Sequence, residues 1–199
     1  MTLRFLSVAA AAAGLLFLGA GCGLFGDETG GQVVIRLTDE PLIADSVIVS
    51  IVSVEFIDSE SGERETVVLE PAAEGINLLE YQEGATLLIA DGEVSLARFD
   101  QFRLRVGDSP TIWFGTDGHD LHIASGASSG IKFFLDEALE LNGGTFDVTL
   151  DFDAAESVVP LGPADAPTGW VFTPVIRPVA ATANGAELSV SEGVVEDGA

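Results

Sequence analysis

Residues 145–153 decide the fold, and they read Thr-Phe-Asp-Val-Thr-Leu-Asp-Phe-Asp. Apolar and polar side chains alternate strictly along this stretch, as they do in a β-strand with one face in the core and one face in water. The core face is formed by Phe146, Val148, Leu150 and Phe152. The opposite face carries Asp147, Thr149, Asp151 and Asp153, and the simplest expectation is that it meets solvent.

Similar short runs lie on both sides of this strand. Residues 33–38 alternate in the same way, and residues 46–56 change phase midway, as a β-bulge would cause. Asn142-Gly143-Gly144 supplies the positive φ that a tight hairpin needs. Residues 170–179 predict a last strand at a sheet edge, because Pro174 and Pro178 cannot donate to a ladder. About ten short strands separated by turns indicate an all-β fold, an antiparallel β-sandwich.

The chain divides into four segments. In residues 1–21 a single basic side chain, Arg4, precedes an apolar run and then small residues, which is the layout of a signal peptide. Residues 22–31 are glycine-rich and predict a flexible tether. Residues 32–179 form the predicted sandwich. Residues 180–199 contain no basic residue and little periodicity, and we expect them to be mostly disordered.

The chain has one cysteine, Cys22, directly after the apolar segment. The stretch 18–22, Leu-Gly-Ala-Gly-Cys, resembles a lipobox, although its leucine stands one position earlier than usual. A lone cysteine has no disulfide partner within the chain, so lipidation explains it better than a structural thiol. Two or three acyl chains would give stable anchoring. We therefore expect a lipoprotein of the bacterial cell envelope, and Gly23 after Cys22 favours the outer membrane.

The composition is strongly acidic, with 8 Lys and Arg against 32 Asp and Glu and a formal charge of -24. Such a chain repels phosphate backbones, which excludes nucleic acid as a partner. The excess charge has two interpretations. It keeps a surface solvated and resistant to aggregation, or it attracts cations such as calcium and basic partners.

The sequence contains little that is typical of an enzyme active site. Residues 126–130 read Gly-Ala-Ser-Ser-Gly and place Ser128 in a nucleophile-elbow pattern, but the segment leads into a strand and both histidines precede it. His119 and His122 are three residues apart, so on a strand they point to opposite faces and do not converge on a metal. No phosphate loop, Cys-Xaa-Xaa-Cys pair or dinucleotide fingerprint is present. We therefore expect the protein not to be an enzyme and to need no cofactor.

The acidic strand offers the best candidate ligands for a metal. Asp147, Asp151 and Asp153 project in parallel and could supply oxygens to calcium, with Asp39 or Glu156 nearby. The alternative, which we favour, is an exposed face or pairing with Arg177 and Lys132.

The aromatic side chains raise a different prospect. Binding of a carbohydrate needs aromatic platforms flanked by polar groups, for which Trp113, Trp170 and Tyr81 are available. The preferred function is thus a non-enzymatic surface module that binds a glycan, a protein or another envelope partner. The alternative is an envelope hydrolase that uses the carboxylates with a metal.

Four different motifs follow one another along the chain: Arg-Leu-Thr-Asp-Glu-Pro at 36–41, Ser-Gly-Ile-Lys at 129–132, Leu-Asp-Phe-Asp-Ala at 150–154 and Pro-Val-Ile-Arg at 174–177. Together they resemble the bacterial and archaeal lipoprotein domain of unknown function four-three-eight-two, over residues 32–179. The resemblance implies an envelope lipoprotein with a transthyretin-like or carbohydrate-binding-like sandwich and no established activity. Phe-Asp-Gln-Phe at 99–102 departs from the Gly-Xaa-Tyr turn that the family tends to have there.

Overall fold

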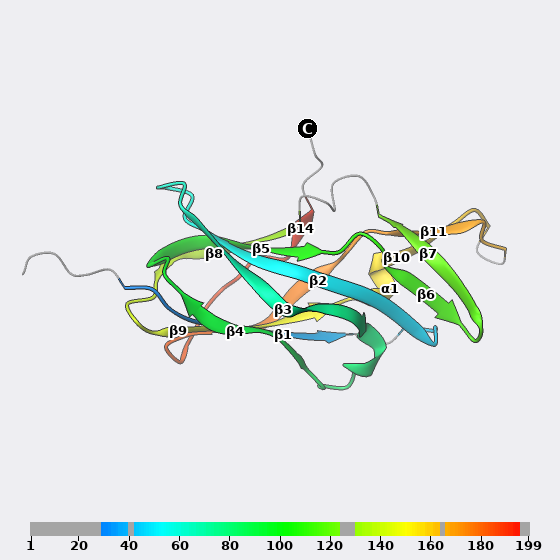
Figure 1. Cartoon of the computed structure of the whole chain (residues 1–199), viewed down its shortest axis with the longest axis horizontal. Coiled ribbons are helices and arrows are strands. Elements are labelled where there is room, and N and C mark those ends of the chain that lie inside the picture. Colours follow the sequence, from blue (N-terminus) through cyan, green and yellow to red (C-terminus); the bar gives the residue numbers. More distant parts are fainter. Residues whose placement is uncertain (1–28, 40–41, 124–129, 164–165, 196–199) are drawn as a thin grey trace, which may run out of the picture.

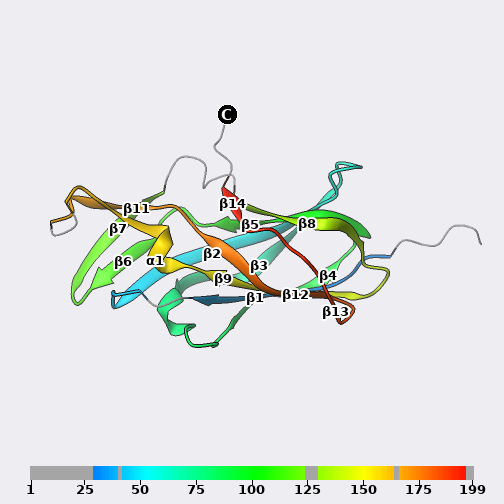
Figure 2. The ribbon, with the colours of Figure 1, turned by 180° about the vertical axis from the view of Figure 1, so that it is seen from behind.

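A computed structural model describes residues 29–39, 42–123, 130–163 and 166–195 of the chain, with backbone alone at 68 and 70–74. Two β-sheets stack face to face as a long sandwich (Figures 1 and 2). The predictions for the signal peptide, Cys22 and the tether up to residue 28 fall outside the described residues, as does Ser128. Within the described ranges, no helix is long and apolar enough to cross a membrane.

One sheet has five strands in the order β13-β12-β9-β1-β4. Their bounds are β1 Gly31–Asp39, β4 Leu87–Val94, β9 Thr145–Phe152, β12 Ile176–Ala183 and β13 Ala186–Glu187. Strands β1 and β9 are parallel, with Gln32 opposite Thr145 and Asp39 opposite Phe152. The other neighbours in this sheet are antiparallel. The decisive acidic strand, β9, therefore lies in the middle of its sheet.

The second sheet has nine strands among the described residues, in the order β10-β11-β7-β6-β2-β5-β8-β14, and β3 pairs with β2 beside this path. Strands β7 and β11 are parallel. The bounds are β2 Ser46–Ile57, β3 Arg64–Asn77, β5 Arg98–Val106, β6 Thr111–Phe114, β7 Asp117–Ile123, β8 Ile131–Glu140, β10 Val158–Leu161, β11 Gly169–Phe172 and β14 Val194–Val195. A 3-10 turn, η1 Leu78–Glu80, and a one-turn helix, α1 Ala154–Ser157, complete the fold.

Phenylalanine rings fill the space between the sheets. The rings of Phe102 and Phe133 stack at 4.7 Å within the nine-stranded sheet, and Phe146 of the other sheet meets Phe102 edge-on at 5.7 Å. The predicted core face of β9 is confirmed, because Phe146, Val148, Leu150 and Phe152 are all fully buried. Burial of such rings is the main source of stability in a sandwich with no disulfide.

The all-β sandwich is confirmed, but the sheets are mixed and not wholly antiparallel. The phase change in residues 46–56 is also confirmed as two register shifts in β2, next to Ile51. Asn142 and Gly143 have positive φ as predicted. Their turn, however, links β8 of one sheet to β9 of the other, so it is no hairpin.

The C-terminal predictions need correction. Residues 170–179 are not one strand, because the chain leaves the nine-stranded sheet after Phe172, passes Pro174 and enters the other sheet as β12. Strand β12 lies between β9 and β13, and Pro178 is tolerated there at a register shift. The prediction that residues 180–199 are mostly disordered is wrong for 180–195, which complete β12 and then form β13, a bridge from Val190 to Leu135, and β14.

Candidate functional site

The candidate metal ligand Asp147 lies on the outer face of β9. It forms an ion pair with Arg36 on the neighbouring strand β1. Both side chains are about a third exposed, at 34% and 35%. The pairing is therefore a surface contact between adjacent strands.

Asp153 follows β9 and is the N-cap of α1. Its Oδ1 accepts a hydrogen bond of 2.8 Å from the backbone N–H of Glu156, as N-cap side chains do. Its Oδ2 accepts a hydrogen bond of 2.7 Å from Arg177 of β12, which also donates to Glu156 at 2.5 Å. These two carboxylates raise the pKa of Arg177. The predicted pairing of the acidic strand with Arg177 is thus confirmed, whereas Lys132 lies on β8 of the other sheet.

Asp39 ends β1 and is also buried. Its carboxylate accepts hydrogen bonds from the backbone N–H of Ala154 at 3.0 Å and from the side-chain amide of Gln82 at 3.3 Å. Burial raises the pKa of Asp39 to about 6, and the negative charges of Asp151 and Asp153 add to the rise. The two hydrogen bonds act in the opposite direction.

Asp39, Asp151 and Asp153 form a buried carboxylate cluster where β1 and β9 end. Asp151 and Asp153 are only 7% and 3% exposed, so the expectation that both lie on a solvated face is wrong. Their strand is central in the sheet, and Arg177 stands opposite Asp151 on β12. In the part of the chain that the structure describes, no three His, Cys, Asp or Glu side chains are grouped so that they could hold a metal ion.

A second cluster is aromatic and lies where β6, β7 and β11 meet. The cross-strand pairs Phe114 with Asp117, Ile112 with His119, and Leu121 with Trp170 place these side chains on one face of the sheet. The ring centroids of Phe114 and Trp170 are 5.2 Å apart, and His119 lies 6.2 Å and 6.4 Å from them. On this face Ile112 and Leu121 are buried in the core, whereas Phe114, His119 and Trp170 border a hollow at the surface.

The three rings line a hollow of about 410 Å³, which we call the distal aromatic hollow. The described residues that line it are Phe114, His119, Pro167, Thr168, Gly169 and Trp170. This volume suits a small ligand or a single side chain. The hydroxyl of Thr168 donates a 3.2 Å hydrogen bond to the Leu161 carbonyl. The other polar side-chain groups among the described lining residues are the His119 imidazole and the Trp170 indole N–H.

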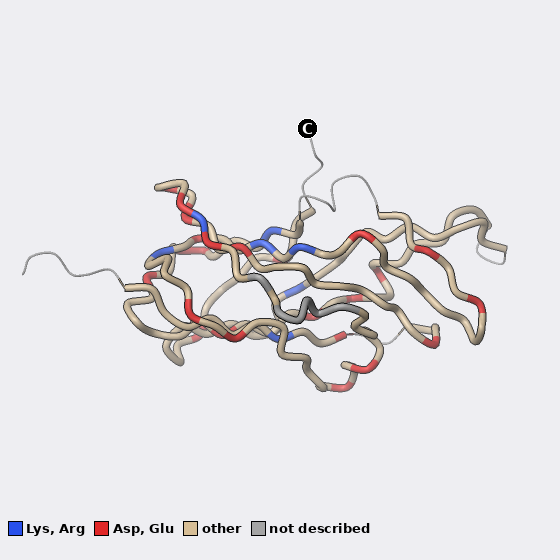
Figure 3. The backbone as a smooth tube through the Cα atoms, viewed as in Figure 1, with Lys and Arg blue, Asp and Glu red and all other residues tan. Residues whose placement is uncertain are grey.

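The surroundings of the hollow are acidic. Strands β6, β7, β10 and β11, all of whose residues the structure describes, contain no Lys or Arg. Asp117 shares the aromatic face, and Asp45 binds the turn between β6 and β7 by accepting a hydrogen bond from the Gly115 N–H. Figure 3 shows the basic residues elsewhere along the backbone, and among the described residues they belong to β1, β3, β5, β8 and β12.

The three aromatic residues singled out in the sequence do not form one platform. Trp113 is 40% exposed and lies on the face opposite Phe114, with its indole across Gly118. A Cβ at Gly118 would come within 2.7 Å of that ring, so any other residue there would displace the indole. Tyr81 packs against the hydrophobic core beside η1. Trp170 alone of the three lines the hollow.

Sequence reasoning missed the roles of Phe114 and His119. His119 and His122 point to opposite faces, as their spacing predicts. The hairpin turn at Gly115-Thr116 could have indicated these roles from the sequence. It pairs β6 with β7 and thereby places His119 on the same face as Phe114.

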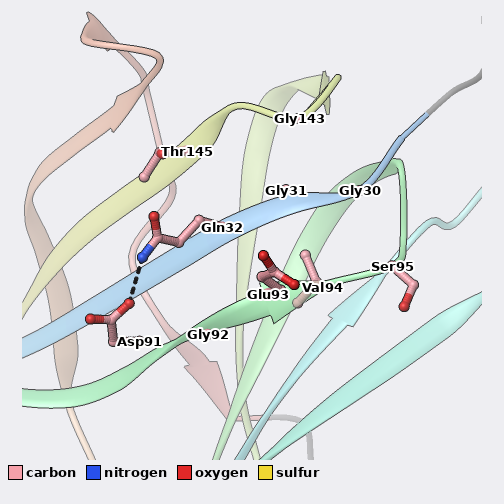
Figure 4. A pocket seen from close by; sticks show the side chains of 10 residues that line it. All are labelled: Gly30, Gly31, Gln32, Asp91, Gly92, Glu93, Val94, Ser95, Gly143 and Thr145. Atoms are coloured by element: carbon pink, nitrogen blue, oxygen red, sulfur yellow. Dashed lines mark hydrogen bonds between the residues drawn. The ribbon is translucent and has the colours of Figure 1, made fainter.

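A larger hollow of about 740 Å³ lies near the beginning of the described chain, between β1, β4 and the turn before β9 (Figure 4). Glycine backbone forms much of its wall, at Gly30, Gly31, Gly92 and Gly143. The side chain of Gln32 donates a 2.7 Å hydrogen bond to Asp91 within it. With so few side chains to select a ligand, this hollow is the weaker candidate.

These features define an all-β sandwich domain with an aromatic hollow at one end and a buried carboxylate cluster between its central strands. The family described as Domain of unknown function (DUF4382) matches residues 30–174. The chain belongs to this family. Three of the four ordered motifs lie within the matched residues, and the fourth begins at the last of them, residue 174. No curated protein and no solved structure matches the chain.

Proposed function

We propose that this protein is a non-enzymatic lipoprotein of the cell envelope and serves as a binding module whose ligand is a glycan or an envelope protein. The observation that carries the proposal is the position of the distal aromatic hollow. The described chain begins at one end of the sandwich, and β6, β7 and β11 lie at the other (Figures 1 and 2).

A lipid on Cys22 would hold the sandwich at its N-terminal end through the short stretch 22–31. The distal aromatic hollow would then face away from the membrane, where a partner can reach it. Aromatic rings bordering a concave surface are the usual anchors of both glycan and protein ligands.

The alternative, a hydrolase that uses carboxylates with a metal, finds less support. Asp153 caps α1 and binds Arg177, and Asp39 binds Ala154 and Gln82. Both carboxylates thus hold the ends of strands together. A catalytic role would require these contacts to be broken or shared.

The test is a binding screen with the full chain, purified from membranes in a non-ionic detergent, against arrayed envelope glycans and purified envelope proteins. We expect a ligand whose binding is lost in Trp170→Ala and retained in Trp113→Ala, the matched control on the opposite face. Hydrolysis of an arrayed glycan, lost in a folded Asp153→Asn variant, would instead establish the hydrolase.

A further inference from the structure

We propose that the distal aromatic hollow binds an alkylammonium group, meaning a primary amine or quaternary ammonium carried on a hydrocarbon. The inference rests on the proposed function, because it names the chemical group by which a ligand of this module would be held. It follows from the ring geometry, the charge around the hollow and the predominance of ring surface over hydrogen-bonding side chains among the described lining residues.

The walls suit a cation that carries hydrocarbon. Phe114 and Trp170 are tilted by 32° at 5.2 Å, and His119 adds a third ring from the intervening strand. A cation within about 6 Å of an aromatic centroid is attracted by the ring quadrupole, most strongly by tryptophan. The methylene or methyl groups of an alkylammonium gain apolar contact with the same rings.

The charge around the hollow selects the sign of the ligand. Asp117 stands opposite Phe114 on the same face, and β6, β7, β10 and β11 contain no Lys or Arg. The whole chain carries a formal charge of -24, which draws cations in and repels carboxylates and phosphates. An anionic ligand would meet no Lys or Arg on these strands.

The rim argues against a neutral sugar as the group that fills the hollow. A sugar needs hydrogen-bond partners around its ring as well as an aromatic platform. The Thr168 hydroxyl donates to the Leu161 carbonyl, and Pro167 and Gly169 have no polar side chain. Among the described lining residues this leaves the His119 imidazole and the Trp170 indole N–H, fewer partners than the several hydroxyls of a sugar ring require. A quaternary ammonium donates no hydrogen bond and needs only ring faces and nearby negative charge, whereas a primary ammonium also donates to acceptors such as the Asp117 carboxylate on the same face.

The chain's two tryptophans allow a direct test. In a Trp113→Phe variant of the full chain, Trp170 is the only indole and its fluorescence reports on the hollow. The probes are choline chloride, its neutral isostere 3,3-dimethylbutan-1-ol, Nα-acetyl-lysine amide with its free side-chain ammonium, and a neutral trisaccharide, with sodium chloride keeping the ionic strength constant. Choline and the lysine derivative distinguish a quaternary headgroup from a protein side chain as the source of the cation.

We expect a saturable response of Trp170 to choline, to the lysine derivative or to both, and affinity about tenfold lower for the neutral isostere. Phe114→Leu should weaken the binding, with an unchanged circular dichroism spectrum as the control for folding. In the converse variant, Trp170→Phe, the remaining Trp113 lies on the opposite face and should not respond.

Equal affinity for choline and its neutral isostere would overturn the proposal, and so would the absence of a response to either cation. Saturable binding of the trisaccharide alone would overturn it too, but would leave the proposed binding function standing. Failure of the proposed function is recognised separately, in the screen of envelope glycans and proteins.

Discussion

The carboxylate of Asp39 accepts a hydrogen bond of 3.0 Å from the backbone N–H of Ala154, a residue 115 positions further along the chain. This bond ties the end of β1 to the start of α1, directly after the parallel strand β9. The carboxylate is buried beside Asp151 and Asp153, and its pKa is raised to about 6. Near neutral pH Asp39 is therefore deprotonated, and its buried negative charge lowers the stability of the folded protein.

The first prediction is that Asp39→Asn stabilises the protein at pH 7.5. Between the ordinary pKa of 3.8 and the folded value of about 6, the native state binds more protons than the unfolded state. The free energy of unfolding therefore falls as pH rises through this window, by about 3 kcal/mol at 1.4 kcal/mol per pKa unit. Asparagine keeps an acceptor for Ala154 without the charge.

Urea unfolding at several values between pH 4 and pH 7.5 measures this effect. The advantage of Asp39→Asn should shrink as the pH falls toward 4, where Asp39 is protonated in the folded protein. Asp147→Asn, on the surface of the same sheet, is the control and should show no such trend. Loss of stability in Asp39→Asn at pH 7.5 would mean that the lost hydrogen bond outweighs the removed charge.

The buried carboxylate cluster shows what an alternating sequence can and cannot predict. The period of two correctly assigns Phe146 and Phe152 to the core. It also places Asp151 on the other face, but it contains no information about what covers that face. The parallel pairing with β1 and the arrival of Arg177 on β12 depend on contacts between distant segments, and these bury the aspartates.

The same limit applies to the distal aromatic hollow. Trp170 could be singled out as a large aromatic residue, yet its neighbours come from β6 and β7, and the parallel pairing of β11 with β7 has no local signal. The sequence alone indicates that Pro174 cannot donate to a β-ladder. Only the positions of β11 and β12 show that Pro174 lies where the chain crosses from one sheet to the other.

The second prediction compares two aspartates that each pair with an arginine. Asp153→Ala should cost about 2 to 4 kcal/mol, because it removes an N-cap and leaves Arg177 without its buried partner. Asp147→Ala should cost less than about 1 kcal/mol, since its pair with Arg36 is partly exposed. Urea unfolding at pH 7.5 measures both, and equal losses would contradict the different roles assigned to the two residues.

The third prediction concerns the core. Phe152 is fully buried and stacks on Phe172 of the other sheet at 5.8 Å. Phe152→Ala should therefore lower the free energy of unfolding by about 3 to 5 kcal/mol. Phe134→Ala, at a position 41% exposed, is the matched control and should cost much less. Similar losses in the two variants would argue against the packing described for Phe152.

The fourth prediction is that salt stabilises the protein. With a formal charge of -24, the folded chain repels itself, and added ions screen that repulsion. The melting temperature should rise when sodium chloride is increased from low to physiological concentration. A melting temperature that falls over this range would show that screened ion pairs matter more than the net repulsion.

Calcium chloride at matched ionic strength separates screening from specific binding. If the candidate ligands Asp147, Asp151 and Asp153 only make the contacts described here, calcium should add no more than general divalent screening, as magnesium does. A larger shift with calcium, reversed by chelator and lost in Asp151→Asn, would establish a calcium site by mass action.

The last prediction is that Cys22 carries the membrane anchor. It is the only cysteine in the chain and directly follows the small residues that end the predicted signal peptide. Metabolic labelling with palmitate should mark the wild-type protein and leave Cys22→Ala unlabelled, because no other thiol is available for thioether attachment of lipid. A labelled Cys22→Ala variant would refute this assignment. Unlabelled wild-type protein that still sediments with membranes would mean that the apolar run 5–18 is retained as the anchor.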